Sequence, residues 1–168
     1  VLAAGPEADA YFVPRKNYFL GRWIKHCGWF PDYRQPQLFR KSRLRYREEL
    51  VHESFDLDGK IGYLTAAALQ YPFRDIDHYL AKQERYSDLM ARRMVEQGRT
   101  FSWHQLVSHP CFTFLKMYVG RKGCLDGVPG LILSGLYAYY TFIKYARFWE
   151  LQSRALPKGS QAATVKQG

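Results

Sequence analysis

The sequence predicts an α+β fold in which short strands come first and about three helices follow. Between residues 10 and 64, short segments rich in aromatic and β-branched residues are separated by Gly, Pro, Asn and Asp. From residue 75 onward, apolar residues instead recur at steps of three or four. A long uncharged run then occupies residues 127–143. The 168 residues suffice for one domain with a sizeable core.

The strand-rich part begins at residues 10–20, where Pro14 interrupts an aromatic segment and predicts a strand, a kink and a second strand. Residues 37–40 and 48–53 predict two further short strands on either side of a basic turn. Residues 61–64 predict another, after the turn-like sequence at 56–59.

The first helix is predicted over residues 75–97, because its apolar residues lie on one side. Asp75 is a favourable N-cap and Gly98 a favourable terminator. A second helix is expected over 102–119 with an interruption before Pro110, since the residue before a proline disfavours helical geometry. A third is expected after Asp126 and Pro129 and extends to about Gln152, followed by a disordered tail over 153–168.

The uncharged run at 127–143 raises the question of membrane contact. It is shorter than the roughly 20 apolar residues that a bilayer core requires, and it contains several tyrosines. We therefore expect residues 131–149 to lie in the membrane interface, with basic side chains reaching lipid phosphates. The alternative is a helix packed in a core or against another subunit.

Charge is distributed unevenly along the chain, whose net charge is +10. Residues 12–47 carry ten Lys or Arg and one acid, and residues 100–168 carry eight bases and two acids. Such basic regions are expected to meet phosphate or anionic lipid. Nucleic acid is the rival partner, but no glycine-aromatic strand motif or basic recognition helix is present, so no nucleic-acid partner is predicted.

Three cysteines at unrelated spacings suggest neither a disulfide framework nor a zinc site. They favour a reduced, cytoplasmic setting. No metal ligands are predicted within this chain.

Three motifs follow one another closely: Gly-Trp-Phe-Pro-Asp-Tyr at 28–33, Gln-Leu-Phe-Arg at 37–40 and Val-His-Glu at 51–53. They resemble the acceptor half of bacterial family 2 glycosyltransferases, in particular the lipopolysaccharide core β-glucosyltransferases. The resemblance continues through 71–75 and 79–82 to the C-terminal aromatic segment, and covers residues 11–150 in all.

The resemblance implies the C-terminal part of an α/β GT-A nucleotide-sugar transferase fold. Family members begin with a donor-binding half that carries an Asp-x-Asp type motif, and this chain is expected to be a fragment that starts after it and is inactive alone. The donor would be a nucleotide diphosphate sugar, with Mg²⁺ or Mn²⁺ held through the missing half. Residues 1–100 would complete the catalytic domain and 101–152 would form a membrane-associating helical region.

Inverting glycosyl transfer requires a base that removes the proton of the acceptor hydroxyl. The resemblance assigns this role to Glu53, with His52 orienting it or touching substrate. The alternatives are a structural ion pair between Glu53 and Arg45 or Arg47, and a core position for His52.

Five further residues are candidates for substrate binding. Trp29 would stack on a sugar or merely pack the turn, and Asp32 would bind sugar hydroxyls or cap it. Arg40 would approach a phosphate or remain a solvated strand end. Lys82 and Tyr86 share a helix face and match recurring family residues, with sheet packing as their alternative role.

The resemblance thus implies a hexosyltransferase, with glucose as the hexose. Its acceptor would be a lipopolysaccharide core or another lipid-linked glycan, and it would act as a peripheral protein on the cytoplasmic face of the bacterial inner membrane. The rival interpretation is a non-catalytic membrane-surface or protein-interaction module.

Overall fold

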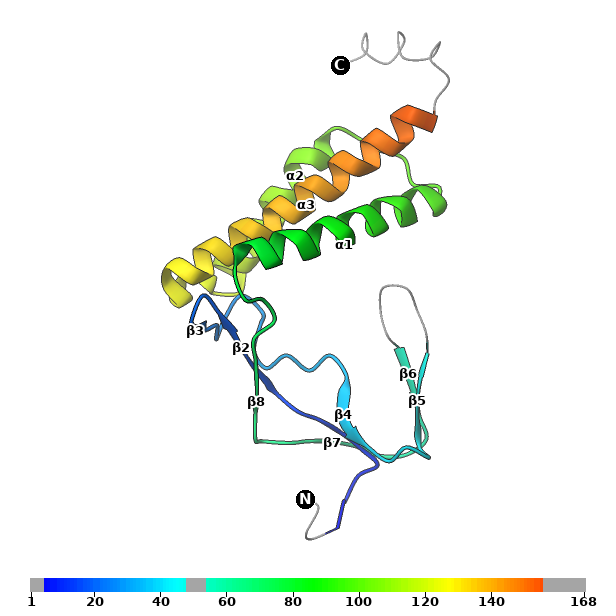
Figure 1. Ribbon diagram of the computed structural model, residues 1–168, viewed down its shortest axis with the longest axis vertical. Helices are drawn as coiled ribbons and strands as arrows, with labels where there is room; N and C mark the ends of the chain where they lie inside the picture. Colours follow the sequence, from blue (N-terminus) through cyan, green and yellow to red (C-terminus); the bar gives the residue numbers. More distant parts are fainter. Residues whose placement is uncertain (1–4, 48–53, 156–168) are drawn as a thin grey trace. The chain divides into compact units, whose positions relative to one another are not determined.

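The computed structural model describes residues 5–47 and 54–155. The chain forms two compact units, Val1–Pro72 and Phe73–Gly168, the first built of strands and the second of helices (Figure 1). The predicted α+β composition is confirmed. The division between the two compact units falls after Pro72, because the first long helix packs against the last one inside the helical unit. The predicted functional division after residue 100 stays a prediction.

Two parallel strand pairs form the backbone of the strand-rich unit. Strand β1 (Ala10–Phe12) pairs with β7 (Ile61–Tyr63), and β2 (Arg15–Phe19) pairs with β8 (Ala68–Gln70). Pro14 separates β1 from β2, as predicted, because proline has no N–H to donate. The ladder nevertheless continues across the kink, where the Ala68 amide donates to the Pro14 carbonyl at 2.9 Å.

Antiparallel strands complete this unit. Strand β4 (Pro36–Phe39) pairs with β1, and the short β3 (Arg22–Trp23) pairs with β2. Strands β5 (Leu44–Arg47) and β6 (Ser54–Leu57) form a separate hairpin. The strands predicted near 37–40 and 61–64 are confirmed. The turn expected at 56–59 begins later, because Asp56 and Leu57 belong to β6.

The strand predicted over 48–53 lies outside the described residues, and so do Glu53 and His52. The sequence analysis missed the two strands that flank this segment. Their basic and acidic side chains explain the omission: Arg45 lies opposite Asp56 in the hairpin, and such charged cross-strand pairs stabilise strands without any alternation of apolar residues.

Helix α1 (Ile76–Glu96) begins and ends where the sequence predicts. Asp75 is its N-cap, and its carboxylate accepts a hydrogen bond from the His78 amide at 2.6 Å. Gly98 follows the helix with a φ of 65°, a conformation that glycine adopts without strain. Both signals therefore act as expected.

The second predicted helix is continuous through its proline. Helix α2 (His104–Leu115) contains Pro110 in its interior and continues into the π-helical turn η1 (Lys116–Gly120). The interruption predicted before Pro110 is absent. Contacts with the last helix hold α2 on both sides of the proline, through a stacked pair of His109 and Tyr145 and through Thr113 and Thr141.

A 3₁₀ turn, η2 (Gly123–Asp126), leads into helix α3 (Gly127–Ala155), which contacts both α1 and α2 (Figure 1). The core of this unit is a cluster of Ala91, Met94, Tyr145 and Phe148. Residues 153–155 belong to α3, whereas the remainder of the predicted tail, 156–168, lies outside the described residues. The alternative of core packing therefore holds for the buried face of α3.

None of the helices among the described residues is long and apolar enough to cross a bilayer.

Candidate functional site

The turn at 28–33 is held in place by one buried amide. Asn17 of β2 is 3% exposed, and its Nδ2 donates to the Trp29 carbonyl at 3.0 Å and to Asp32 Oδ2 at 3.1 Å. The other oxygen of Asp32 accepts a 2.7 Å hydrogen bond from Arg34 Nε. The Asp32 side chain is only 10% exposed. This burial favours a role in capping the turn over a role in binding sugar hydroxyls.

The aromatic residues of the turn have different environments. Trp29 is 5% exposed and packs edge-on against Phe19, so its ring belongs to the core of this unit. This burial favours the packing alternative for Trp29. Phe30 and Tyr33 are 37% and 39% exposed and are the aromatic residues of the turn that offer surface to a ligand.

Tyr33 belongs to an aromatic cluster that joins the turn to three strands. It lies edge-on to Tyr63 of β7 at 5.2 Å between ring centroids, and Tyr63 stacks on Phe12 of β1 at 5.4 Å. Phe12 in turn contacts Phe55 of β6. The cluster of Phe12, Tyr33, Phe55 and Tyr63 therefore connects the turn to the strand that directly follows Glu53 in the sequence.

Arg40 lies immediately after β4 and is fixed at its backbone. Its amide donates to the Asp9 carbonyl at 2.9 Å, and its Nη1 lies 3.5 Å from Asp9 Oδ1. The side chain remains 54% exposed, and an exposed ion pair of this kind contributes little to stability. The guanidinium can therefore exchange Asp9 for another anionic group at small cost.

The β5–β6 hairpin carries a bidentate ion pair next to the predicted catalytic segment. Arg47 Nε and Nη2 donate to the two carboxylate oxygens of Asp56 at 2.7 and 2.6 Å. The hydrogen bond from Arg47 lowers the pKa of Asp56 below its ordinary value. The guanidinium of Arg47 is thus paired with the carboxylate of Asp56.

Lys82 and Tyr86 belong to the helical unit, where both lie on α1. The ammonium of Lys82 lies 5.2 Å from the centroid of the Phe73 ring, a cation–π distance. Tyr86 is 41% exposed. Their predicted roles in substrate binding stay predictions.

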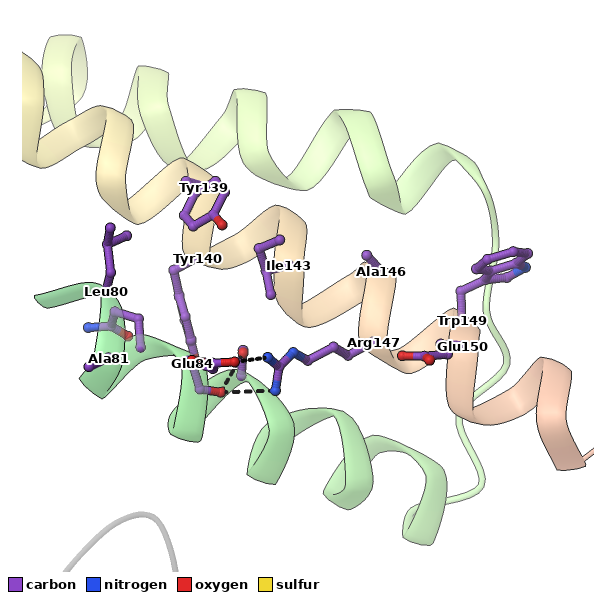
Figure 2. A pocket seen from close by; sticks show the side chains of 12 residues that line it. Leu80, Ala81, Glu84, Tyr139, Tyr140, Ile143, Ala146, Arg147, Trp149 and Glu150 are labelled. Atoms are coloured by element: carbon purple, nitrogen blue, oxygen red, sulfur yellow. Dashed lines mark hydrogen bonds and ion pairs between the residues drawn. The ribbon is translucent and has the colours of Figure 1, made fainter. Parts of the chain in front are cut away.

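A groove between α1 and α3 is the feature that the sequence analysis missed. Its volume is about 690 Å³, and Leu80 and Ala81 of α1 face Tyr139, Tyr140 and Ile143 of α3 across it (Figure 2). Burial raises the pKa of Tyr140. The remaining lining residues are polar or lie toward the end of α3: Gln83, Glu84, Ser87, Ala146, Arg147, Trp149 and Glu150.

Arg147 closes one part of this groove. Its two terminal nitrogens donate to the Glu84 carbonyl and to Glu84 Oε1, both at 3.2 Å (Figure 2). The apolar spacing of α1 signals a buried face, but a groove also requires side chains from α3 that leave the space unfilled. The spacing of apolar residues on one helix does not show whether the side chains of the facing helix fill the space between them.

Burial also shifts the pKa values of two neighbouring side chains on α3. Lys144 has a pKa below its ordinary value, because burial disfavours its charged form and Arg99 adds repulsion. Burial also raises the pKa of Tyr145, whose ring lies 4.8 Å from the Lys144 ammonium. These residues face the interior of the helical unit, where a charge is costly.

We expect Asn17→Ala to destabilise the chain by about 1–2 kcal/mol, because it removes the amide that bonds to both Trp29 and Asp32. Asn17→Asp should cost more, since it places a second carboxylate against Asp32. Urea unfolding of the chain would measure both changes. An Asn17→Ala variant as stable as the wild type would contradict the proposed support of the turn.

The chain was compared with protein-family models, solved structures and curated proteins. No protein-family model matches the chain, and no solved structure matches it. Among curated proteins, it is 28% identical over 157 residues to the lipopolysaccharide core biosynthesis glycosyltransferase LpsC of Rhizobium meliloti, which covers 89% of this chain and 56% of that protein. It is 29% identical over 106 residues to an uncharacterized glycosyltransferase of Rickettsia typhi, and 28% identical over 101 residues to one of Rickettsia conorii.

The match to the Rickettsia typhi protein covers 63% of this chain and 36% of that protein. The chain therefore spans about half the length, or less, of the curated relatives that it matches. The resemblance inferred from the turn, the Leu-Phe-Arg strand and the Val-His-Glu motif is confirmed insofar as the curated homologues are glycosyltransferases. The chain is a homologue of bacterial glycosyltransferases.

Proposed function

We propose that the chain forms the acceptor side of an inverting glycosyltransferase of the GT-A type. It would transfer a hexose, glucose by resemblance, from a nucleotide diphosphate sugar to a lipopolysaccharide core or another lipid-linked glycan. The observation that supports this most is the similarity to LpsC across 89% of the chain. The name of that relative specifies lipopolysaccharide core biosynthesis, which favours a glycan acceptor.

In this proposal, the acceptor hydroxyl attacks the anomeric carbon of the donor as the bond to the diphosphate breaks. Glu53 accepts the hydroxyl proton, and the attack from the opposite side inverts the anomeric configuration. His52 orients Glu53. Phe30 and Tyr33 provide the exposed aromatic surface on which the apolar face of a sugar could stack.

Arg40 has a supporting electrostatic role. Negative charge develops on the departing diphosphate, and a half-exposed guanidinium that is held only by a weak pair with Asp9 can turn toward it or toward an acceptor phosphate. Such a positive group stabilises charge that is larger in the transition state than in the ground state.

In this proposal, the divalent metal would lie outside this half of the site. Among residues 5–47 and 54–155, no group of three or more His, Cys, Asp or Glu side chains could hold a metal ion. Mg²⁺ or Mn²⁺ would be held by the donor-binding half. Separately, Lys82 and Tyr86 of α1 would contribute to substrate binding.

The proposed setting is the cytoplasmic face of the inner membrane, where a lipid-linked acceptor is anchored. The excess of basic residues suits an acceptor and a surface that are both anionic.

Deletion of the gene in its source organism tests this function. The lipopolysaccharide core or lipid-linked glycan should lose one hexose, visible by mass spectrometry, and the complete reading frame supplied in trans should restore it. Unchanged glycan masses in the deletion strain would contradict the proposal.

A further inference from the structure

Helix α2 exposes apolar side chains that a helix in a bundle normally buries. None of its twelve residues is fully buried, although it contacts α3 through Thr113 and through His109. Phe112 and Leu115 are 63% and 56% exposed. The apolar residues of α2 therefore lie largely on the side that faces away from α3.

The exposed residues continue from α2 into the elements that follow it. Turn η1 contacts α2 and η2, and η2 contacts the first turns of α3. All the large apolar residues concerned are between 44% and 67% exposed. We call this set the α2 apolar surface: Trp103, Val107, Phe112, Leu115, Val119, Leu125, Val128 and Leu131.

Basic residues accompany this surface and exposed acids do not. Lys116, Arg121 and Lys122 are all exposed and lie in or next to η1. Between Glu96 and Glu150 the sequence contains one acid, Asp126, and this residue is 3% exposed. The segment that forms the surface, residues 103–131, therefore carries exposed apolar and basic side chains and no exposed carboxylate of its own.

This combination fits lipid better than other partners. Nucleic acid offers phosphate but would leave the aromatic and aliphatic side chains in water at a cost, whereas the interface of an anionic bilayer receives both kinds of group. The burial of an exposed Phe or Leu at that interface is favoured by the area removed from water. No helix among the described residues spans the bilayer, so contact would be from one side.

We propose that the α2 apolar surface inserts into the interfacial layer of an anionic phospholipid bilayer, with Lys116, Arg121 and Lys122 bound to lipid phosphates. The proposal deepens the proposed peripheral location but is independent of the transfer chemistry. It places the inserted surface mainly on α2 and η1, whereas the insertion of residues 131–149 that the sequence indicated stays a prediction. Leu133, Tyr145 and Phe148 of that segment are buried in the helical unit, and only part of α3 remains exposed.

Flotation of the purified chain with liposomes tests the surface. The probes are vesicles of phosphatidylcholine alone and of phosphatidylcholine with phosphatidylglycerol. The wild type should float with the anionic vesicles and do so less as salt rises, because charges more than about 10 Å apart are screened at 0.1 M. Absence of flotation with any vesicle would overturn the proposal.

Two double variants separate the apolar and the electrostatic contributions. Phe112→Ser with Leu115→Ser should lower partitioning into anionic vesicles at least about tenfold. Arg121→Gln with Lys122→Gln should lower it about tenfold or more at low salt and have little effect at high salt. All four side chains are exposed, so circular dichroism should show unchanged folding.

The matched control is Leu89→Ser, a change of the same kind at a 48% exposed position on α1. It should bind vesicles like the wild type. If it lost binding as strongly as the Phe112 and Leu115 variant, or if that variant and the basic variant both bound normally, the assignment of the surface would be wrong.

Size-exclusion chromatography of the same proteins identifies a competing occupant. If the Phe112 and Leu115 changes dissociated a dimer and left flotation unchanged, the surface would bind a second copy instead of lipid. Flotation needs neither donor nor acceptor sugar, so its failure is distinguishable from failure of the proposed transferase activity.

Discussion

Replacement of Glu53 by Gln should lower the rate of hexose transfer by at least about a hundredfold, since general-base catalysis contributes roughly 10² to 10⁴ in rate. The amide keeps the size and much of the hydrogen bonding of the carboxylate but cannot accept the hydroxyl proton. Donor binding and the melting temperature should change little, because the missing interaction forms only in the transition state. Steady-state kinetics of the protein made from the complete reading frame would measure the effect.

Asp56→Asn is the matched control, at a carboxylate three residues after Glu53 in the sequence. It removes the charge of a carboxylate that bonds to Arg47 through both oxygens but that has no assigned role in transfer. Turnover should stay near that of the wild type. If Glu53→Gln retained normal turnover, the base would lie elsewhere. If it unfolded the protein, the structural alternative of an ion pair with Arg45 or Arg47 would be favoured.

Gly130→Ala should be the most damaging of the conservative changes in the helical unit. A Cβ at this position would overlap the backbone oxygen of Gly123 and lie 2.9 Å from the Cβ of Asp126. Neither neighbour is the end of a flexible side chain, so η2 and α3 would have to separate. Overpacking typically costs about 1–3 kcal/mol, and we expect about 3 kcal/mol or more here. Urea unfolding of the chain would measure the loss.

Gly135→Ala supplies the opposite expectation in the same helix. A Cβ there has no neighbour within 4 Å, and the position lies inside α3. The change should stabilise the chain by about 0.5–1 kcal/mol, because alanine loses less conformational freedom in a helix than glycine. Equal changes in the free energy of unfolding at Gly130 and Gly135 would contradict the close packing of η2 against α3.

The sequence predicted elements whose signals are local. Pro14 divides β1 from β2, and Asp75 and Gly98 delimit α1, because each acts through its own backbone or through a neighbour within one turn. Pro110 was misjudged because tertiary contacts of α2 with α3 overrode a local preference.

The sequence predicted where the aromatic turn of the candidate site lies, but not which of its side chains are exposed. The motif at 28–33 indicated an aromatic turn, and the turn is present, yet its sequence does not say which ring turns inward. Packing against Phe19 buries Trp29, while Phe30 and Tyr33 remain partly exposed. The amide of Asn17 that holds the turn lies twelve residues from Trp29, and no periodicity reports such a contact.

The apolar surfaces were the least predictable part. The uncharged run at 127–143 predicted membrane contact for α3 but did not indicate which of its faces is exposed. Leu133 is buried, whereas Val128 and Leu131 are exposed and belong to the α2 apolar surface. The sequence analysis identified no exposed apolar face on α2, yet Val107, Phe112 and Leu115 are exposed. Composition reports how much apolar surface a segment has, whereas the arrangement of neighbouring helices decides which of it is covered.

The most direct test of the account is an in vitro transfer assay with the protein made from the complete reading frame. It would be incubated with a nucleotide diphosphate hexose, UDP-glucose first, and a lipopolysaccharide core acceptor that lacks the terminal hexose. The account predicts transfer of one hexose with inverted anomeric configuration, as read by NMR. No transfer from any of the common nucleotide sugars, or a product that retains the donor configuration, would contradict it.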